Sequence, residues 1–122
     1  MQNWIYVFIG GGLGSMLRYG IGLYFSSTNS AFPIGTFIAN FFACFILGIL
    51  MGFELKNNIQ TSSSVFFATG FCGGFSTFST FSNESLKLFE NQQYGLGLLY
   101  IGSSVILGLI AIYLGIKLYN TF

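Results

Sequence analysis

One segment of this chain combines residue types that could bind an ion. Residues 70–82 join glycines, hydroxyl side chains and evenly spaced phenylalanines inside a stretch apolar enough to enter a membrane. Glycine weakens a helix by about 1 kcal/mol relative to alanine, so the adjacent Gly73 and Gly74 predict an interruption there. The interruption would free carbonyls, which suit a hard cation, and N–H groups, which suit an anion. We therefore expect this segment to line an ion path or an ion site.

In the half-helix after this glycine pair, the spacing places aromatic and polar side chains on neighbouring faces. Phe78 and Phe81 lie three residues apart on one face. The polar residues beside them are Thr77, Ser79, Thr80 and Glu84. Because an aromatic ring has a positive edge, a small anion could meet ring edges and hydroxyl donors along one track. The alternative is that both phenylalanines only pack, like most of the 16 in the chain.

Uncharged polar residues also follow helical spacing in two other apolar stretches. Asn40 would lie near the middle of the membrane, on a face with Thr36 one turn earlier. Tyr100 and Ser104 form an i, i+4 pair, with Ser103 beside it. These side chains could hydrogen-bond between helices or act as donors to an ion, and the spacing leaves both roles open.

The first apolar stretch repeats small residues around a single arginine. Gly10, Gly14, Arg18 and Gly22 recur at intervals of four. Small residues at this spacing let helix backbones approach closely, and we assign that role to the glycines. An arginine inside a span must snorkel to the interface, find a partner or face an aqueous vestibule. A vestibule that gathers anions is the sharper hypothesis for Arg18.

The composition indicates an integral membrane protein. Among 122 residues only four are Lys or Arg and three are acidic, while 53% are hydrophobic. Apolar stretches near the roughly 20 residues that span a bilayer as a helix cover residues 4–25, 34–53, 65–89 and 95–118. Short polar connections make successive helices antiparallel neighbours. We predict an all-α protein with one domain over residues 1–122 and four transmembrane helices, the third broken at Gly73 and Gly74.

The positive charges give the chain no clear orientation. Lys56 and Lys117 would lie on one side of the membrane, and Lys87 and Arg18 on the other. Because orientation follows the Lys/Arg bias between loops, the chain could insert both ways and form an antiparallel homodimer. A partner is also expected because a four-helix bundle fills its own centre with side chains.

Several function classes are excluded by the residues that the chain lacks. It has no His and no Asp, and its three Glu residues lie at or near predicted helix ends. Acid–base, metal-ligand and triad constellations therefore cannot be assembled, and we expect no enzyme activity. No basic patch exists to bind nucleic acid. Cys44 and Cys72 form no CxxC pair and are expected to be plain buried thiols.

Three motifs together resemble the Fluc (CrcB) family of fluoride channels. The first is Gly11-Gly12-x-Gly14-x-x-x-Arg18-Tyr19, and the second is Gly35-Thr36-x-x-x-Asn40. The third and most specific is Gly73-Gly74-x-Ser76-Thr77-Phe78-Ser79-Thr80-Phe81-Ser82-x-Glu84. The likeness covers the whole chain, although Ala43 stands where the family pattern has glycine.

The resemblance implies an architecture and a transport function. It implies a dual-topology homodimer in the bacterial plasma membrane, with two fluoride pathways on either side of a central structural sodium ion. Fluoride would leave the cell passively through these pathways. The implied partners of the chain are fluoride, sodium, the lipid bilayer and a second copy of itself.

The resemblance also implies roles for individual residues. The implied pore-lining residues are Asn40, Phe78, Ser79, Thr80 and Phe81, followed on the fourth helix by Tyr100 and Ser104. Backbone carbonyls of Gly73 and Ser76 from both subunits would hold the sodium ion. Arg18 is similar to the family's vestibule arginine, and Glu84 to its acidic residue beyond the pore motif, with Thr77 in the same polar track.

Two other functions fit the size and charge balance of the chain. A dual-topology four-helix multidrug/proton antiporter needs a titratable carboxylate deep in its substrate site, and the first apolar stretch contains none. A structural membrane subunit that transports nothing would use its Gly, Ser and Thr stripes only for assembly.

Overall fold

Every regular element in residues 2–122, the part of the chain described by this computed structural model, is a helix. Three elements are long: α1 (Gln2–Phe25), α2 (Ile34–Leu55) and α6 (Tyr94–Thr121). The shorter elements between α2 and α6 are α3 (Thr61–Ser64), the π-helical η1 (Val65–Cys72), α4 (Gly73–Phe75) and α5 (Phe78–Glu90). The predicted all-α fold is confirmed, and its apolar stretches match these elements closely.

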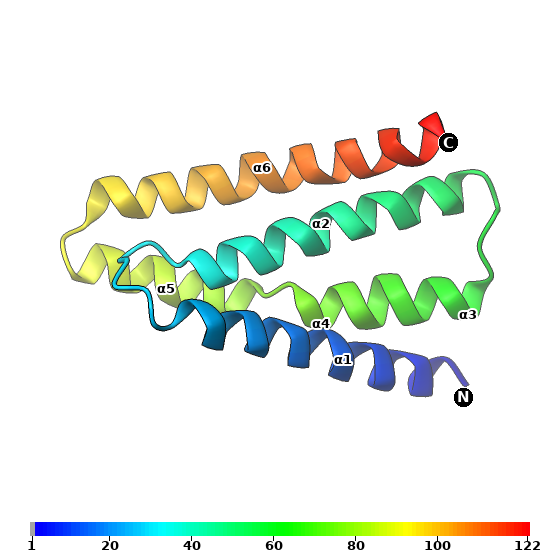
Figure 1. Ribbon diagram of the computed structural model, residues 1–122, viewed down its shortest axis with the longest axis horizontal. Helices are drawn as coiled ribbons and strands as arrows, with labels where there is room; N and C mark the ends of the chain where they lie inside the picture. Colours follow the sequence, from blue (N-terminus) through cyan, green and yellow to red (C-terminus); the bar gives the residue numbers. More distant parts are fainter. Residues whose placement is uncertain (1) are drawn as a thin grey trace.

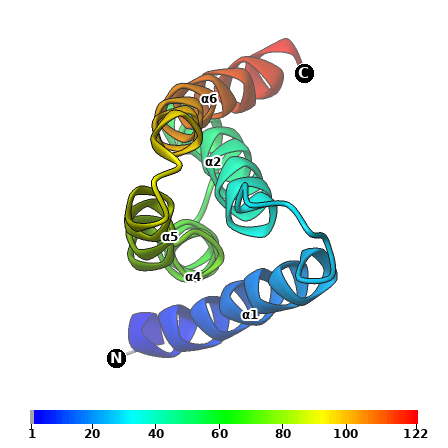
Figure 2. The same cartoon turned by 90° about the vertical axis from the view of Figure 1, so that its left-hand side faces the viewer.

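The helices run back and forth along one long axis. Both termini and the α2–α3 connection lie at the same end of the molecule (Figure 1). Seen along that axis, α1 and α6 form opposite sides, and α2, α4 and α5 lie between them (Figure 2). The most extensive contacts join α2 to α6 and α1 to η1 and α4. The polypeptide therefore packs as two helix pairs, and the third stretch links one pair to the other.

Glycines let both helix pairs approach closely. A Cβ atom at Gly10 or Gly14 of α1 would overlap a backbone carbonyl oxygen of η1. A Cβ atom at Gly48 of α2 would likewise overlap the carbonyl oxygen of Ile112 on α6. The predicted packing role is thus confirmed for Gly10 and Gly14, whereas a Cβ atom at Gly22 would meet nothing within 4 Å.

Two of the described helices, α2 and α6, are long and apolar enough to cross a membrane by length and composition. Helix α1 has 24 residues, but its glycines and Arg18 lower its hydropathy. The third stretch is divided, so no single helix in it has the required length.

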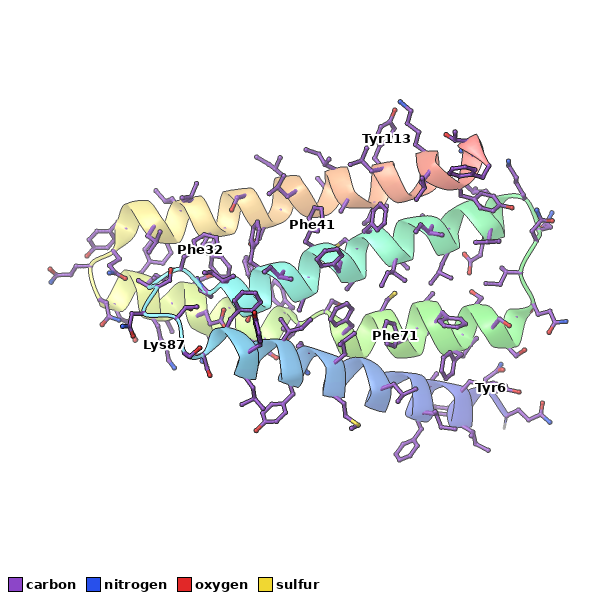
Figure 3. All side chains as sticks on the ribbon, viewed as in Figure 1. Tyr6, Phe32, Phe41, Phe71, Lys87 and Tyr113 are labelled. Atoms are coloured by element: carbon purple, nitrogen blue, oxygen red, sulfur yellow. The ribbon has the colours of Figure 1, made fainter. Side chains whose placement is uncertain are left out.

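Large apolar side chains cover the outside of the molecule. Trp4 and Phe8 of α1 are 79% and 81% exposed, and Leu109 and Tyr113 of α6 are 66% and 62% exposed. Tyr113 points outward from α6 (Figure 3). A surface this apolar suits contact with lipid or another subunit instead of water.

The interruption in the third stretch lies later than predicted. Gly73 is helical, with φ −63° and ψ −37°, and α4 continues past Gly74. The backbone becomes extended at Ser76 and Thr77, where ψ is 160° and 126°. The predicted break at Gly73 and Gly74 is therefore wrong in position. Gly74 serves close packing, because a Cβ atom there would overlap a backbone carbonyl of α1, and the residues after it carry the side chains that replace lost helical hydrogen bonds.

Candidate functional site

The extended break between α4 and α5 is held by an asparagine from another helix. Asn40, on α2, accepts a hydrogen bond from the Thr77 backbone N–H at 2.7 Å and donates its side-chain amide to the Thr77 carbonyl at 3.2 Å. One side chain thus satisfies both backbone polar groups of a residue that has left the helix. Because unpaired backbone groups are costly at membrane depth, this pair of bonds stabilises the break.

Hydroxyl groups on either side of the break complete its hydrogen bonding. The Ser76 hydroxyl donates to the Cys72 carbonyl at 2.8 Å, and the Thr77 hydroxyl accepts from the Thr80 N–H at 3.2 Å. Thr77 is therefore the N-cap of α5, a position at which threonine is favoured because it satisfies a free helical N–H.

The exchange of helical hydrogen-bond partners at the break leaves two backbone carbonyls without their usual donors. In a continuous α-helix the N–H of residue i donates to the carbonyl of residue i−4. Here the Thr77 N–H donates to Asn40 instead of Gly73, and the Thr80 N–H donates to the Thr77 hydroxyl instead of Ser76. The Gly73 and Ser76 carbonyls thereby lose their helical donors. Ser76 lies at the break itself. Gly73 lies on an open face, where a Cβ atom would meet nothing within 4 Å.

A hollow of about 280 Å³ lies beside the break. Its lining comes from α2, the break, α5 and α6: Asn40, Cys44, Ser76, Thr77, Phe78, Phe81, Ser104 and Val105. Within the described residues the Ser104 hydroxyl oxygen is buried and has no hydrogen-bond partner. Since buried polar groups are normally paired, an unpaired hydroxyl on a residue that lines this hollow needs an explanation.

Two phenylalanines follow the hollow along α5. The ring centroids of Phe78 and Phe81 are 6.1 Å apart. Phe81 is half-buried and lies 5.1 Å from the ring of Tyr100 on α6, whereas Phe78 is 79% exposed. Phe81 is therefore packed between the hollow and Tyr100, whereas Phe78 lines the hollow with most of its ring exposed.

A second polar cluster lies one step further along α5. The Glu84 carboxylate accepts hydrogen bonds from the Thr36 hydroxyl at 2.7 Å and from the Tyr100 hydroxyl at 2.9 Å. Tyr100 has no exposed surface. The ring of Phe32, just before α2, meets the Tyr100 ring edge-on at a centroid distance of 5.3 Å. Side chains of α2 and α6 thus donate hydrogen bonds to one carboxylate on α5.

Glu84 also faces the outside of the molecule. It lines two hollows of about 230 and 330 Å³ next to the α1–α2 connection. Lys87 lines the larger of these two hollows and lies at the same end of the molecule as that connection (Figure 3). Polar side chains therefore extend from the break, past Phe81 and Tyr100, to an open end of the helix bundle.

Arg18 lies next to the break on its other side. Its Nε donates to the Gly74 carbonyl at 3.0 Å, and the Ser15 hydroxyl approaches the same oxygen at 3.4 Å. A cation at a helix C-terminus stabilises the helix dipole. Arg18 has thus found a protein partner, and its assignment to an anion-gathering vestibule stays a prediction.

The structure brings most of the predicted site residues together. Those at the hollow are Asn40, Ser76, Thr77, Phe78, Phe81 and Ser104, and Tyr100 with Glu84 forms the adjoining cluster. Ser79 and Thr80 do not line the hollow; the Ser79 hydroxyl is exposed and 3.4 Å from that of Thr77.

Two contributors were missed as site residues by the sequence analysis. Thr36 was noted one turn before Asn40, but nothing in its spacing pointed to the carboxylate of Glu84. Ser15 precedes Arg18 by three residues, so the two share a helix face. That spacing was the available signal for their common contact with the Gly74 carbonyl.

Comparison with known proteins identifies the family. The model of the family described as CrcB-like protein, Camphor Resistance (CrcB), matches residues 5–116. A fluoride-specific ion channel FluC of Azobacteroides pseudotrichonymphae is 45% identical, with 93% of each chain covered. The FluC of Oceanobacillus iheyensis is 42% identical over 97% of this chain and 92% of its own. The FluC 1 of Staphylococcus aureus is 42% identical over 96% of each chain.

These matches place the polypeptide in a class and then in a family. The all-helical chain with its apolar exterior has the features of a membrane protein, and the matched relatives are named as ion channels. The chain belongs to the CrcB-like family. Membership confirms the resemblance seen in the three sequence motifs, and it confirms that the protein is not an enzyme.

Proposed function

We propose that this protein is a fluoride-selective channel that lets fluoride leave the cell passively. The observation that carries the proposal is the hollow at the break. Ser104, whose buried hydroxyl has no hydrogen-bond partner among the described residues, lines it together with Asn40 and Phe81. The relatives named as fluoride-specific channels support the choice of ion.

The chemistry of the lining suits a small, strongly basic anion. Fluoride is a strong hydrogen-bond acceptor and holds its water tightly, so a selective path must replace that water with closely placed donors. The hydroxyl of Ser104, the side-chain amide of Asn40 and the positive ring edges of Phe78 and Phe81 supply such donors without a full charge to trap the ion. Chloride is larger and a weaker acceptor, and gains less from the same groups.

The proposed order of groups follows the polar side chains of α5. Fluoride passes the hollow at Asn40 and Ser104, moves along Phe78 and Phe81, and reaches Tyr100 and Glu84. Ser79 and Thr80, near the start of α5, are proposed to join this track on the side that faces a second subunit. Arg18 is proposed to attract anions toward one entrance.

The proposed functional unit is an antiparallel dual-topology homodimer with two pathways and four transmembrane helices in each subunit. Phe78 is 79% exposed, and the face around Gly73 is open, so this side of the break is available for a partner. The even split of Lys and Arg between the two ends fits insertion in both orientations. A second copy would close the hollow on its open side. The proposed location is the bacterial plasma membrane.

A structural sodium ion at the dimer centre is part of the proposal. Hard monovalent and divalent cations prefer oxygen ligands, including backbone carbonyls. The Gly73 and Ser76 carbonyls fit this requirement, because the hydrogen bonds of Asn40 and Thr77 remove their helical donors. Two carbonyls from each subunit would hold the ion, which would fix the two breaks against each other.

Fluoride efflux from liposomes tests the transport function. Vesicles that contain the purified chain are loaded with fluoride, and its release is followed with a fluoride electrode. The proposal predicts rapid release that needs no proton gradient. Release only with a proton gradient, together with uptake of an organic cation, would indicate an antiporter. No transport of either kind would indicate a structural subunit.

Replacement of sodium tests the central ion. The purified protein is exchanged into a buffer in which a bulky organic cation replaces all sodium, and its oligomeric state is measured by size exclusion with light scattering. The proposal predicts a weakened dimer, restored when sodium returns and not when the organic cation concentration is raised. An equally stable dimer without sodium would mean that Gly73 and Ser76 only shape the backbone.

A further inference from the structure

The two cysteines of the chain line one small cavity between α2 and the third stretch. Cys44 lies on α2 and Cys72 ends η1, and both line a hollow of about 140 Å³. Both are free thiols. The remaining lining residues are Ala43, Leu47, Ala68, Gly73 and Ser76. The contact of α2 with η1 and α4 brings the two cysteines to one cavity, although nothing in their sequence spacing indicates it.

The side chains that line the cavity offer sulfur and little else to a ligand. Its lining contains no carboxylate and no imidazole, and the Ser76 hydroxyl already donates to the Cys72 carbonyl. Hard cations need several oxygen ligands, and a zinc site needs four ligands or three with an open position. Thiolates select soft metals such as Cu(I). Two sulfurs match the two-coordinate geometry that the soft monovalent cations Cu(I) and Ag(I) accept.

We propose that Cys44 and Cys72 form a binding site for one soft monovalent cation of this class. On binding, each thiol releases its proton and each sulfur forms one bond to the metal. One cation and two thiols thus give a metal bis-thiolate and two protons. No atom changes its oxidation state, so no oxidant or reductant is required.

A cation at this site is placed to change ion flow. Cys44 also lines the larger hollow that contains Asn40, Phe81 and Ser104. The Cys72 carbonyl accepts a hydrogen bond from the Ser76 N–H at 2.9 Å. Cys72 is therefore hydrogen-bonded to the first residue of the break. A metal that bridges the two sulfurs would tie α2 to the helix before the break and slow fluoride movement. This consequence rests on the proposed channel function, whereas binding of the metal does not.

Native mass spectrometry with Ag(I) tests the site directly. Silver nitrate is titrated into the full-length purified protein in chloride-free buffer, since chloride would precipitate silver. One Ag(I) is expected to remain bound per chain. Cys44→Ser and Cys72→Ser should each weaken binding by more than about tenfold, the lower end of the loss seen when even an outer-shell partner is removed. Met16→Leu, which removes an exposed thioether on α1, is the soft-ligand control and should bind like the wild type.

The outcomes separate the site from its effect on transport. Each serine variant must first elute like the wild type in size exclusion, which shows that it is folded. Unchanged silver binding in either of them would then overturn the paired site. In fluoride-loaded liposomes, Ag(I) should slow efflux of the wild type and leave the double serine variant unaffected. Bound silver with unchanged efflux would overturn the coupling to the pathway. If the untreated protein moves no fluoride, the proposed function fails, and the binding result still decides the site.

Discussion

The two sides of the third stretch use small and polar residues in opposite ways. Toward α1, Gly74 packs where a Cβ atom would overlap a carbonyl, and the helix is continuous there. Toward α2 and α6, Asn40 and Thr77 replace helical hydrogen bonds, and the backbone opens beside a hollow. One side is close-packed, and the other carries an unpaired buried hydroxyl at Ser104.

The contrast shows that the glycine pair and the break in the helix lie at different positions and have different causes in this protein. Low helix propensity alone did not end α4, because propensity is a weak preference that tertiary contacts override. The helix ends where side chains from its own sequence and from α2 offer the backbone other partners. The close-packed side toward α1 therefore acts as a rigid support. The side toward α2 and α6, where side chains replace helical hydrogen bonds, is the place where an ion could be bound.

Removal of the amide that braces the break should have the largest effect. Asn40→Ala leaves the Thr77 N–H and carbonyl without their partners, at about 1–3 kcal/mol for each group, and removes a donor from the hollow. Fluoride efflux from liposomes should fall by more than about 100-fold, since each 1.4 kcal/mol corresponds to tenfold. Asn58→Ala, which deletes an exposed amide bonded to Tyr119, is the matched control. Wild-type efflux in the Asn40 variant would remove this residue from the pathway.

Loss of the packed aromatic ring should have the next largest effect. Phe81→Ile removes a ring edge from the hollow and the ring contact with Tyr100. Efflux measured with a fluoride electrode should fall by about tenfold or more, which is 1.4 kcal/mol on the barrier, while size exclusion shows an unchanged oligomer. Phe67→Ile, at an exposed site on η1, should leave efflux unchanged. Equal rates in the two variants would show that Phe81 only packs.

A methyl group on the close-packed side should lower stability. Gly14→Ala places a Cβ against the Phe71 carbonyl and 2.7 Å from the Phe75 backbone nitrogen. Overpacking of this kind costs about 1–3 kcal/mol, to be measured by thermal unfolding in detergent. Gly12→Ala, where the new atom meets nothing within 4 Å, should be neutral or slightly stabilising. Similar melting temperatures for both variants would contradict the close approach of α1 and η1.

Loss of the cap should have the smallest effect. Thr77→Val keeps the size of the side chain but removes the acceptor for the Thr80 N–H. Loss of an N-cap costs about 0.5–2 kcal/mol, so both the melting temperature and the efflux rate should fall modestly. Thr28→Val, in the exposed α1–α2 connection, is the comparison. An unchanged start of α5, measured by hydrogen exchange at Thr80 in both variants, would argue against the cap.

The extent of the helices could be predicted because it follows from local chemistry. Runs of apolar residues end at polar connections, and Pro33 precedes the first residue of α2. The existence of a break was also predictable, since residues 70–82 mix glycines and hydroxyls in an apolar stretch. The association of Asn40, Phe81 and Ser104 was implied by the family resemblance, because helical spacing alone left their roles open.

The position of the break could not be predicted from its own residues. It depends on Asn40 reaching Thr77 from α2, and on Arg18 and Ser15 reaching Gly74 from α1. These are contacts between residues far apart in the sequence. The spacing of Ser15 and Arg18 places both on one helix face, but it does not indicate which residue they contact. The same holds for Thr36 with Glu84 and for the two cysteines at one cavity.

Parallel release of two halides is the most direct test of the account. Liposomes that contain the purified chain are loaded with equal concentrations of fluoride and chloride, and both ions are followed with selective electrodes in the same sample. If the donors at the break between α4 and α5 form a selective path, the liposomes should release fluoride rapidly and retain chloride. Retention of both ions, or release of both at similar rates, would contradict the claim that this break forms a selective path.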